Sequence, residues 1–453
     1  MKHFIIASIL LFSTALFQAQ TTLIPDTNFE QALIDLGLDN VLDGGVLTAS
    51  ISGVTDLYVD GQNISDLTGI DDFTALTVLF CNNNQLTSLG VAQNTALEFL
   101  QCADNQLTSL DVSQNTALEF LHCFYNQLTS INVTQNTALT RLDCRGNTLT
   151  SLDVSQNMAL TGLWCGNNQL SSLDVAQNTA LSDLSCDDNQ LTSFNVTQNA
   201  TLTSLICENN QLTSLDVAQN IALELFNCSN NGLTSLDVSQ NTALAFLHCS
   251  FNQLTSLDVS QNTALTLFSC SSNQLTSLDI TQNTTLYDLY CDDNQLTHLD
   301  VSQNAVLIHL YCNSNQLTCL NVANGNNINI SGFSANGNPN LSCIEVDDIL
   351  YSIINWTNID AGSSFSTKCP NFCFHSIINE NSLSRLSIYP NPSNTGLIQT
   401  NTDLNYSDIK IYSIEGKQIN FTKTNNVIDI SDNEKGVYLI SIDGVVMRYV
   451  YQE

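Results

Sequence analysis

The sequence has very few basic residues. Lysine and arginine together account for only 10 of its 453 residues, against 43 aspartates and glutamates, which gives a net charge of −33. Charged residues make up 12% of the chain, about half the usual share. Nucleic acids and anionic membrane surfaces would repel such a chain, so we exclude both as partners. Cationic partners, divalent ions and neutral ligands such as glycans suit it better.

Enzyme signatures and long apolar stretches are also missing. The sequence contains no G-x-S-x-G, H-E-x-x-H, P-loop or dinucleotide fingerprint. After residue 20 no apolar run approaches the length that crosses a bilayer, which predicts a mature chain without a transmembrane segment. Residues 4–17 do form an apolar run, which follows Lys2 and precedes the small-residue region at Ala19 and Gln20. This pattern is typical of an export signal, which we place at residues 1–20.

Cysteine is the most regular feature of the sequence. Twelve cysteines follow one another at intervals of 21 residues: Cys81, Cys102, Cys123, Cys144, Cys165, Cys186, Cys207, Cys228, Cys249, Cys270, Cys291 and Cys312. A fixed period of this length predicts a solenoid, in which each unit buries its apolar side by stacking on its neighbours. The unit at 97–117 reads LEFLQCADNQLTSLDVSQNTA, with one alternating tripeptide in each half. Two short strands per turn predict a mainly β fold with two parallel sheets around a narrow core.

The first half of this unit carries the residues of a known repeat. Leu97, Leu100, Cys102, Asn105 and Leu107 match the leucine-rich-repeat pattern, with cysteine in the last strand position. The second half shows the same pattern of leucine and asparagine positions, so the unit resembles the short bacterial leucine-rich repeats of 21 residues. The resemblance covers residues 54–320 and implies a leucine-rich-repeat solenoid. Repeated asparagines such as Asn105 are expected to stack as inward-facing ladders that satisfy the turns.

Both ends of such an array need covers, because the outermost turns would otherwise expose core and unpaired strand edges. We assign residues 21–53 to an N-terminal cap with a short helix at 26–38. Thr27 and Glu30 fit a capping box, in which the threonine is the residue that caps the helix. The 21-residue period breaks at Asn321. We therefore assign residues 321–369 to a C-terminal cap and residues 370–385 to a linker.

The tail at residues 386–453 has a different character. Alternating strand patterns separated by turn residues predict a small β-sandwich. Its strings YPNP (389–392) and GVYL (436–439) resemble the C-terminal sorting domain of type IX secretion in Bacteroidetes. This resemblance implies the type IX machinery as a partner, passage across the outer membrane, and a secreted or cell-surface location. The alternative is an accessory or binding β-sandwich.

The sixteen cysteines fall into two groups. The twelve ladder cysteines are predicted to be reduced core thiols, because adjacent turns keep their side chains parallel and about 4.8 Å apart, whereas a disulfide needs convergent Cβ atoms about 3.8 Å apart. The other four, Cys319, Cys343, Cys369 and Cys373, are disulfide candidates in an exported cap. Of these we favour the pair Cys343 and Cys369.

Aspartate forms a second ladder in the other half of the repeat. Its unbroken part consists of Asp216, Asp237, Asp258, Asp279 and Asp300. Carboxylates about 5 Å apart repel one another by roughly 3 kcal/mol at an effective dielectric of 20. The file should therefore recruit cations, raise some aspartate pKa values or use the neighbouring hydroxyls. Calcium accepts carboxylate oxygens, which makes the file a candidate metal site, although a solvated face with loosely held ions is the simpler interpretation.

The two faces of the repeat differ in variability. Outward positions beside the Leu-Asp-Val segments hardly change, whereas those beside Leu-x-Cys differ from turn to turn and include many aromatics. A regular scaffold with one diversified aromatic face is typical of a recognition surface. Arg141 and Arg145 are the only basic residues in the array. They centre the candidate ligand-binding set: Phe99, Phe120, His122, Arg141, Asp143, Arg145 and Trp164.

Three functions remain open from the sequence. The first is a secreted or surface-displayed protein that binds a protein or glycan through the variable face. The second is a structural or cation-organising surface component that uses the aspartate ladder. The third, a glycan-processing enzyme, has little support, because glycosidases need two paired carboxylates in a cleft and the ladder offers equivalent ones on a regular face. We therefore predict no catalytic residues and no cofactor other than calcium.

Overall fold

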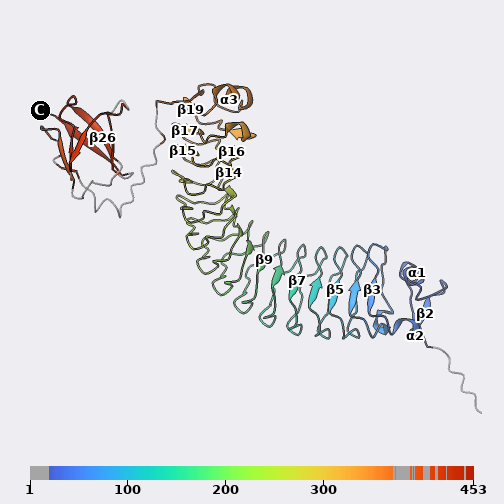
Figure 1. Cartoon of the computed structure of the whole chain (residues 1–453). Helices are drawn as coiled ribbons and strands as arrows, with labels where there is room; N and C mark the ends of the chain where they lie inside the picture. The colour runs from blue at the N-terminus through green and yellow to red at the C-terminus, as the bar shows by residue number, and fades with distance from the viewer. Residues whose placement is uncertain are drawn as a thin grey trace, which may run out of the picture.

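The computed structural model shows a curved solenoid and a separate small domain of antiparallel strands (Figure 1). It describes residues 20–370, 373, 388–389, 391, 393–400, 409–413, 417–424, 426–442 and 445–452. The predicted export signal, apart from Gln20, and most of the predicted linker lie outside the described residues.

The solenoid is built on one sheet of fourteen parallel strands, each of three residues. Neighbouring strands pair one turn apart, so that Leu100 of one strand lies opposite Leu121 of the next. The middle residue of each strand is buried and its two neighbours face outward, because side chains alternate along a strand. The strands are β3 (Asp56–Tyr58), β4 (Val78–Phe80), β5 (Phe99–Gln101), β6 (Phe120–His122), β7 (Arg141–Asp143), β8 (Gly162–Trp164), β9 (Asp183–Ser185), β10 (Ser204–Ile206), β11 (Leu225–Asn227), β12 (Phe246–His248), β13 (Leu267–Ser269), β14 (Asp288–Tyr290), β16 (His309–Tyr311) and β18 (Gly332–Ser334).

A second parallel sheet runs along the opposite side of the turns. It confirms the prediction of two sheets but is confined to the C-terminal end, where it consists of β15 (His298–Asp300), β17 (Cys319–Asn321), β19 (Cys343–Glu345) and β20 (Ser364–Ser366). In the earlier described turns the same segments bury their leucine and valine without forming a ladder, except for one bridge between Gly90 and Asp111. In Figure 1 β14 and β16 lie on the inner side of the bend, and β15 and β17 on the outer side.

The core is a stack of leucine, valine and cysteine side chains. All twelve ladder cysteines are buried and free. Burial raises the pKa of Cys102 and of Cys144 to about 12, because a thiolate would lose its hydration there. The thiols are therefore packing groups.

Two asparagine ladders join the turns. In one, the Nδ2 group of Asn105 donates to the carbonyls of Cys81 and Cys102, and its Oδ1 accepts from the amide of Leu86. In the other, Asn115 Nδ2 donates to carbonyls of the preceding turn, including that of Asn94. Each buried amide thereby satisfies backbone groups that would be costly to leave unpaired.

The N-terminal cap combines a helix and a hairpin. It contains β1 (Thr21–Leu23), α1 (Thr27–Asp35), β2 (Gly45–Leu47) and α2 (Thr48–Ile51), and the short helix η1 (Ile70–Asp72) follows β3. The expected cap helix is present, but the capping box is wrong. Asp26 is the N-cap and accepts from the amides of Asn28 and Phe29. Glu30 does not reach back to the helix start, because its carboxylate accepts from the amides of residues 43–45.

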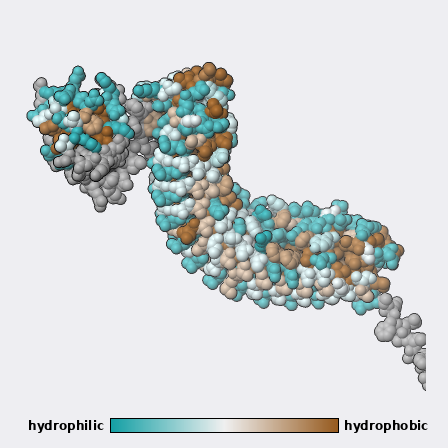
Figure 2. Space-filling model, viewed as in Figure 1, coloured by the Kyte–Doolittle hydropathy of each residue, from teal (hydrophilic) through white to brown (hydrophobic). Residues whose placement is uncertain are grey.

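Beyond residue 320 the parallel stacking of the solenoid continues for further turns, and the C-terminal cap follows. β18, β19 and β20 extend the two sheets, and η2 (Asn327–Asn329) and α3 (Ile349–Asn355) cover the end. Cys343 and Cys369, the pair favoured from the sequence, form a disulfide, and a second disulfide joins Cys319 to Cys373. Hydrophobic residues gather on the surface at this end (Figure 2), where Leu350 is exposed on α3.

The tail forms two antiparallel sheets. The first contains β21 (Ile388–Tyr389), β22 (Leu397–Thr400), β25 (Val427–Asp429) and β24 (Thr422–Thr424). The second contains β23 (Ile409–Ser413), β26 (Gly436–Ile442) and β27 (Val445–Tyr451). Ile398 and Ile428 from the first sheet share one hydrophobic core with Ile411 and Ile440 from the second. This packing gives the expected small β-sandwich.

Candidate binding face

The outward residues of the fourteen-stranded sheet form a continuous face along the solenoid. Each strand presents two outward side chains, one on either side of its buried residue. These positions are variable in the sequence, and neighbouring ones lie about 4.8 Å apart from turn to turn. The chain can therefore change this face one residue at a time without disturbing the core.

An aromatic–arginine patch occupies this face from β5 to β8. We define it by Phe99, Phe120, His122, Phe124, Tyr125, Arg141, Asp143, Arg145 and Trp164. The rings of Phe99 and Phe120 stack with centroids 4.7 Å apart. The guanidinium carbon of Arg141 lies 5.5 Å from the centre of the Phe120 ring. Among the described residues Arg141 makes no ion pair, so its exposed charge can meet a carboxylate or an aromatic ring of a ligand.

The second arginine has a different role. Arg145 donates to both carboxylate oxygens of Asp143, at 3.0 and 2.7 Å, and lies over the ring of Phe124. These hydrogen bonds raise the pKa of Arg145. Asp143 is buried, so the ion pair satisfies a carboxylate that could not remain alone in that position. Arg145 and Asp143 support the patch, whereas Arg141 presents its charge to solvent.

Two residues of the predicted set are less accessible than their type suggests. Burial lowers the pKa of His122, which is therefore neutral at pH 7. Trp164 is half-buried and its indole folds over Gly162, where a Cβ would overlap the ring. The missing side chain at residue 162 thus provides the space for the tryptophan. Sequence spacing alone does not predict this packing, because it does not determine the rotamer of the tryptophan side chain.

Sequence reasoning missed two aromatic residues at the turn that follows each strand. Tyr125 and Phe251 have positive φ angles of 50° and 55°. Twelve other described turns have this conformation three residues after their strand, and there it is held by Gly61, Asn83, Asp104, Gly146, Asn167, Asp188, Asn209, Asn230, Ser272, Asp293, Ser314 and Gly337. Small residues and asparagine tolerate the left-handed conformation, whereas bulky aromatics rarely adopt it. Both rings are more than half exposed, and their departure from the repeat was readable in the sequence.

A second group of aromatics lies near the C-terminal end of the face. Tyr290 and Tyr311 stack with centroids 5.3 Å apart and ring planes 4° apart. His309 Nδ1 lies 2.6 Å from a carboxylate oxygen of Asp288. Burial and then the carboxylate of Asp288 raise the pKa of Tyr290. No lysine or arginine occurs between Arg145 and Lys368, so this part of the face is acidic.

The aspartate ladder is occupied by hydrogen bonds within each turn. Oδ1 of each ladder aspartate accepts from the backbone amide two residues later, and the five such bonds from Asp216 to Asp300 measure 2.9–3.0 Å. Repulsion along the ladder predicts raised pKa values, but the pKa values of Asp111, Asp153 and Asp237 are lowered, first by these amides. Within the described part of the chain, no three His, Cys, Asp or Glu side chains gather as metal ligands do.

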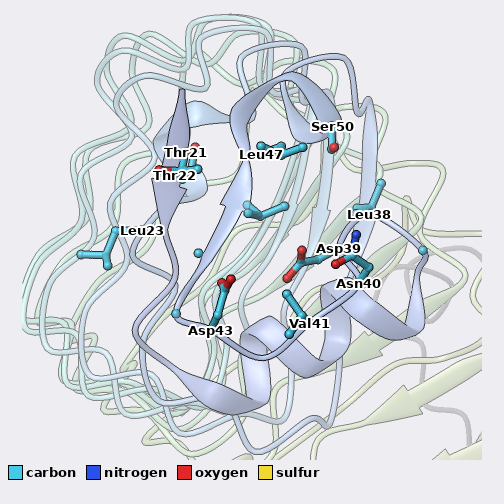
Figure 3. A pocket seen from close by; sticks show the side chains of 14 residues that line it. Thr21, Thr22, Leu23, Leu38, Asp39, Asn40, Val41, Asp43, Leu47 and Ser50 are labelled. Carbon is cyan, nitrogen blue, oxygen red and sulfur yellow. The ribbon is translucent and has the colours of Figure 1, made fainter. Parts of the chain in front are cut away.

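A hollow in the N-terminal cap lies apart from the strand face. It is enclosed by the hairpin and the loop after α1, and Asp39 and Asp43 are the only carboxylates in its lining (Figure 3). Glu30 holds the backbone of this loop. Two carboxylates without further metal-ligating side chains define no site, so we assign no function to the hollow.

The turns, ladders and caps define the class of this protein. It belongs to the leucine-rich-repeat proteins, as its 21-residue units predicted. It is similar to the functional domain of InlJ from Listeria monocytogenes, whose structure includes a cysteine ladder, with 30% sequence identity and a TM-score of 0.66. That similarity covers 96% of this chain and 99% of the InlJ domain.

Two further solved structures share the fold. An internalin, inlF, from Listeria monocytogenes is 21% identical with a TM-score of 0.56 and covers 77% of this chain and 97% of its own. A leucine-rich-repeat protein from Leptospira interrogans is 21% identical with a TM-score of 0.50 and covers 70% of this chain and 97% of its own. These neighbours are leucine-rich-repeat domains and not enzymes. No curated protein gives a match to the sequence.

The tail has its own assignment. Residues 387–450 match the secretion system C-terminal sorting domain. This confirms the resemblance to the sorting tails of type IX secretion, and the protein is secreted or displayed at the outer-membrane surface. Among the described residues, no helix has both the length and the apolarity needed to cross a membrane.

Proposed function

We propose that this leucine-rich-repeat protein is a non-enzymatic binding or adhesion protein that recognises a partner protein through the aromatic–arginine patch. The observation that carries the proposal is Arg141, an exposed guanidinium without an ion pair among the described residues, held over Phe120 beside the Phe99 ring. Rigid aromatics around one arginine are the composition of protein interaction hot spots. The ion pair between exposed Arg145 and buried Asp143 fixes a second guanidinium within the patch.

Charge indicates what the partner presents to this patch. A carboxylate or an aromatic ring of the partner would pair with the exposed guanidinium. The protein around the patch is acidic, so long-range electrostatics attract a cationic partner and do not draw a carboxylate to Arg141. Specific contacts with the rings therefore have to dominate.

The test is binding of the purified full chain, without its export signal, to an array of defined surface proteins and glycans. The variants Arg141→Gln and Tyr125→Asn should weaken binding to a protein on the array by at least about tenfold, the effect expected for a hot-spot residue. Asp153→Asn changes one charge on the opposite face and should have no effect. Binding to glycans alone, or protein binding that both patch variants leave intact, would contradict the proposal.

A further inference from the structure

A shallow trough crosses the strand face well away from the aromatic–arginine patch. We call it the serine trough. It is lined by residues of five successive turns, from Glu208 at one end to Tyr290 at the other, with Ser229, Ser250 and Ser271 between them. One step between turns is about 4.8 Å, so its length is roughly 19 Å, which matches about six residues of extended polypeptide.

The floor of the trough consists of small side chains that are held in place by hydrogen bonds. Ser250 is buried, and its hydroxyl lies 2.8 Å from that of Ser269 on the next turn. Ser271 Oγ donates to Asp292 at 3.4 Å. Small hydroxyl side chains leave room for a backbone to lie against the sheet, and they can donate to or accept from its amide groups.

Two aromatic side chains, Phe251 and Tyr290, also line the trough. Phe251 is 61% exposed and is held upright by its left-handed backbone, at a position where the other turns mostly carry asparagine, aspartate or serine. Tyr290 stacks on Tyr311 through one face and borders the trough beside Ser269. Backbone strain and an exposed ring both cost stability, which a structural role for Phe251 does not explain.

Fixed negative charge lies at both ends. Glu208 lines the first end, where its carboxylate accepts from Asn227 Nδ2 at 2.6 Å. Asp292 lies at the other end, four turns after Glu208. Asp288 lies two residues before Tyr290 on β14. No lysine or arginine from residue 146 to residue 367 offsets these charges. His248, also beside the trough, has a pKa lowered by burial and is neutral at pH 7.

We propose that the serine trough seats an extended basic segment of a partner polypeptide. One lysine or arginine of the segment pairs with Glu208, and a second, about six residues along on the same face, pairs with Asp292 against the ring of Tyr290. The aliphatic part of the segment packs on Phe251. Both end carboxylates accept hydrogen bonds from neutral groups, but a neutral oligosaccharide would bring no cation to balance their charge, so the charges favour a basic peptide. This inference adds a second, basic contact to the protein partner of the proposed function and rests on it in that respect.

The test measures binding of labelled peptides of about seven residues to the full chain, without its export signal, by fluorescence anisotropy at about 0.15 M salt. One peptide carries lysine at its first and last positions, and the other carries the same two lysines side by side. The end-spaced peptide should bind at least about fivefold more tightly, since only it reaches both carboxylates. Equal affinities would mean attraction to net charge alone and would overturn the proposal, as would a preference for neutral oligosaccharides.

Variants then locate the site. Phe251→Asn leaves the charge unchanged and suits the backbone, and it should weaken the end-spaced peptide at least about tenfold without lowering the melting temperature. Glu208→Gln should weaken it similarly. Asp216→Asn removes the same charge on the opposite face, in a register where the chain already has Asn195, and should change nothing. Equal losses with Glu208→Gln and Asp216→Asn would refute the site.

The patch variant separates this inference from the proposed function. Arg141→Gln should leave peptide binding intact. If no peptide binds while a partner protein still depends on Arg141, the trough inference fails and the proposed function stands. If the peptide binds and no partner protein depends on Arg141, the proposed function fails and the trough remains.

Discussion

The ring of Tyr125 occupies the space into which a side chain at residue 146 would project, because a Cβ on Gly146 would overlap the ring. Both residues hold the same position in successive turns, and both have a positive φ. The glycine therefore does more than satisfy its own backbone. Because Gly146 has no side chain, the Tyr125 ring of the preceding turn can occupy this space, where it also contacts the ring of Phe124.

This relationship predicts an energetic coupling between the two residues. Gly146→Asn should lower the free energy of unfolding by about 1–2 kcal/mol, because the new side chain displaces the Tyr125 ring. The loss should largely disappear in a Tyr125→Asn background, where asparagine follows asparagine as in turns 209 and 230. Denaturant unfolding of the two single variants and the double variant measures the coupling. Purely additive effects would show that the ring and residue 146 do not compete.

Phe251→Asn should stabilise the protein by about 1 kcal/mol, because asparagine tolerates the left-handed conformation better than phenylalanine. Little packing is lost, since the ring is 61% exposed. Phe246→Ser is the matched control, as it removes an exposed ring from an extended strand position that carries Ser204 in another turn. Only the first variant should raise the denaturation midpoint. A drop on replacing Phe251 would mean that the ring supports the fold.

The buried thiols predict a loss of stability in alkali. Burial raises the pKa of Cys102 to about 12 from a usual value of 9.0, so the folded chain keeps protons that the unfolded chain releases. The stabilisation from the raised pKa is complete below pH 9 and declines as the pH rises toward 12. Thermal unfolding between pH 8 and pH 11 should show this decline. At pH 8.5 the native ladder thiols should resist alkylation, and rapid labelling of all twelve would contradict their burial.

Removal of divalent cations should leave the melting temperature unchanged within about 1 °C. Each ladder aspartate accepts from an amide in its own turn, such as Asp237 from Ser239, and each turn contributes a single carboxylate. A calcium ion takes six to eight oxygen ligands, which a flat row of single carboxylates does not gather. Melting curves in EDTA and in calcium check this. A rise of several degrees with calcium would favour the cation-organising role considered from the sequence.

The 21-residue period made the fold predictable, because one pattern had to bury leucine and cysteine at the same places in every turn. Local geometry was less accessible. The sequence pointed to Thr27 as the helix cap, but Asp26 also lies at that junction, and its charged carboxylate accepts from two amides. The extent of the second sheet depends on hydrogen bonds between turns, which the shared Leu-Asp-Val pattern does not distinguish.

The candidate site was predictable in composition but not in arrangement. Variable aromatics and the only two arginines of the array located the patch. Pairing of Arg145 with Asp143 and burial of Trp164 over Gly162 depend on rotamers and on neighbours one turn away. Tyr125 and Phe251 were overlooked because they lie outside the strand positions, in a turn whose left-handed backbone conformation cannot be predicted from the repeat pattern.

The asparagine ladders have a consequence for how such a protein changes over generations. Each ladder amide makes hydrogen bonds to the preceding turn, as Asn105 does to Cys81 and Leu86. Successive units therefore present the same connector at both ends, so units can follow one another in other orders wherever their outward side chains do not overlap, as Tyr125 would with a side chain at residue 146. Duplication or loss of a 21-residue stretch of the gene lengthens or shortens the array without a new core. Recombination between units can thus move whole recognition elements, such as the turn that carries Phe251, along the protein in a single step.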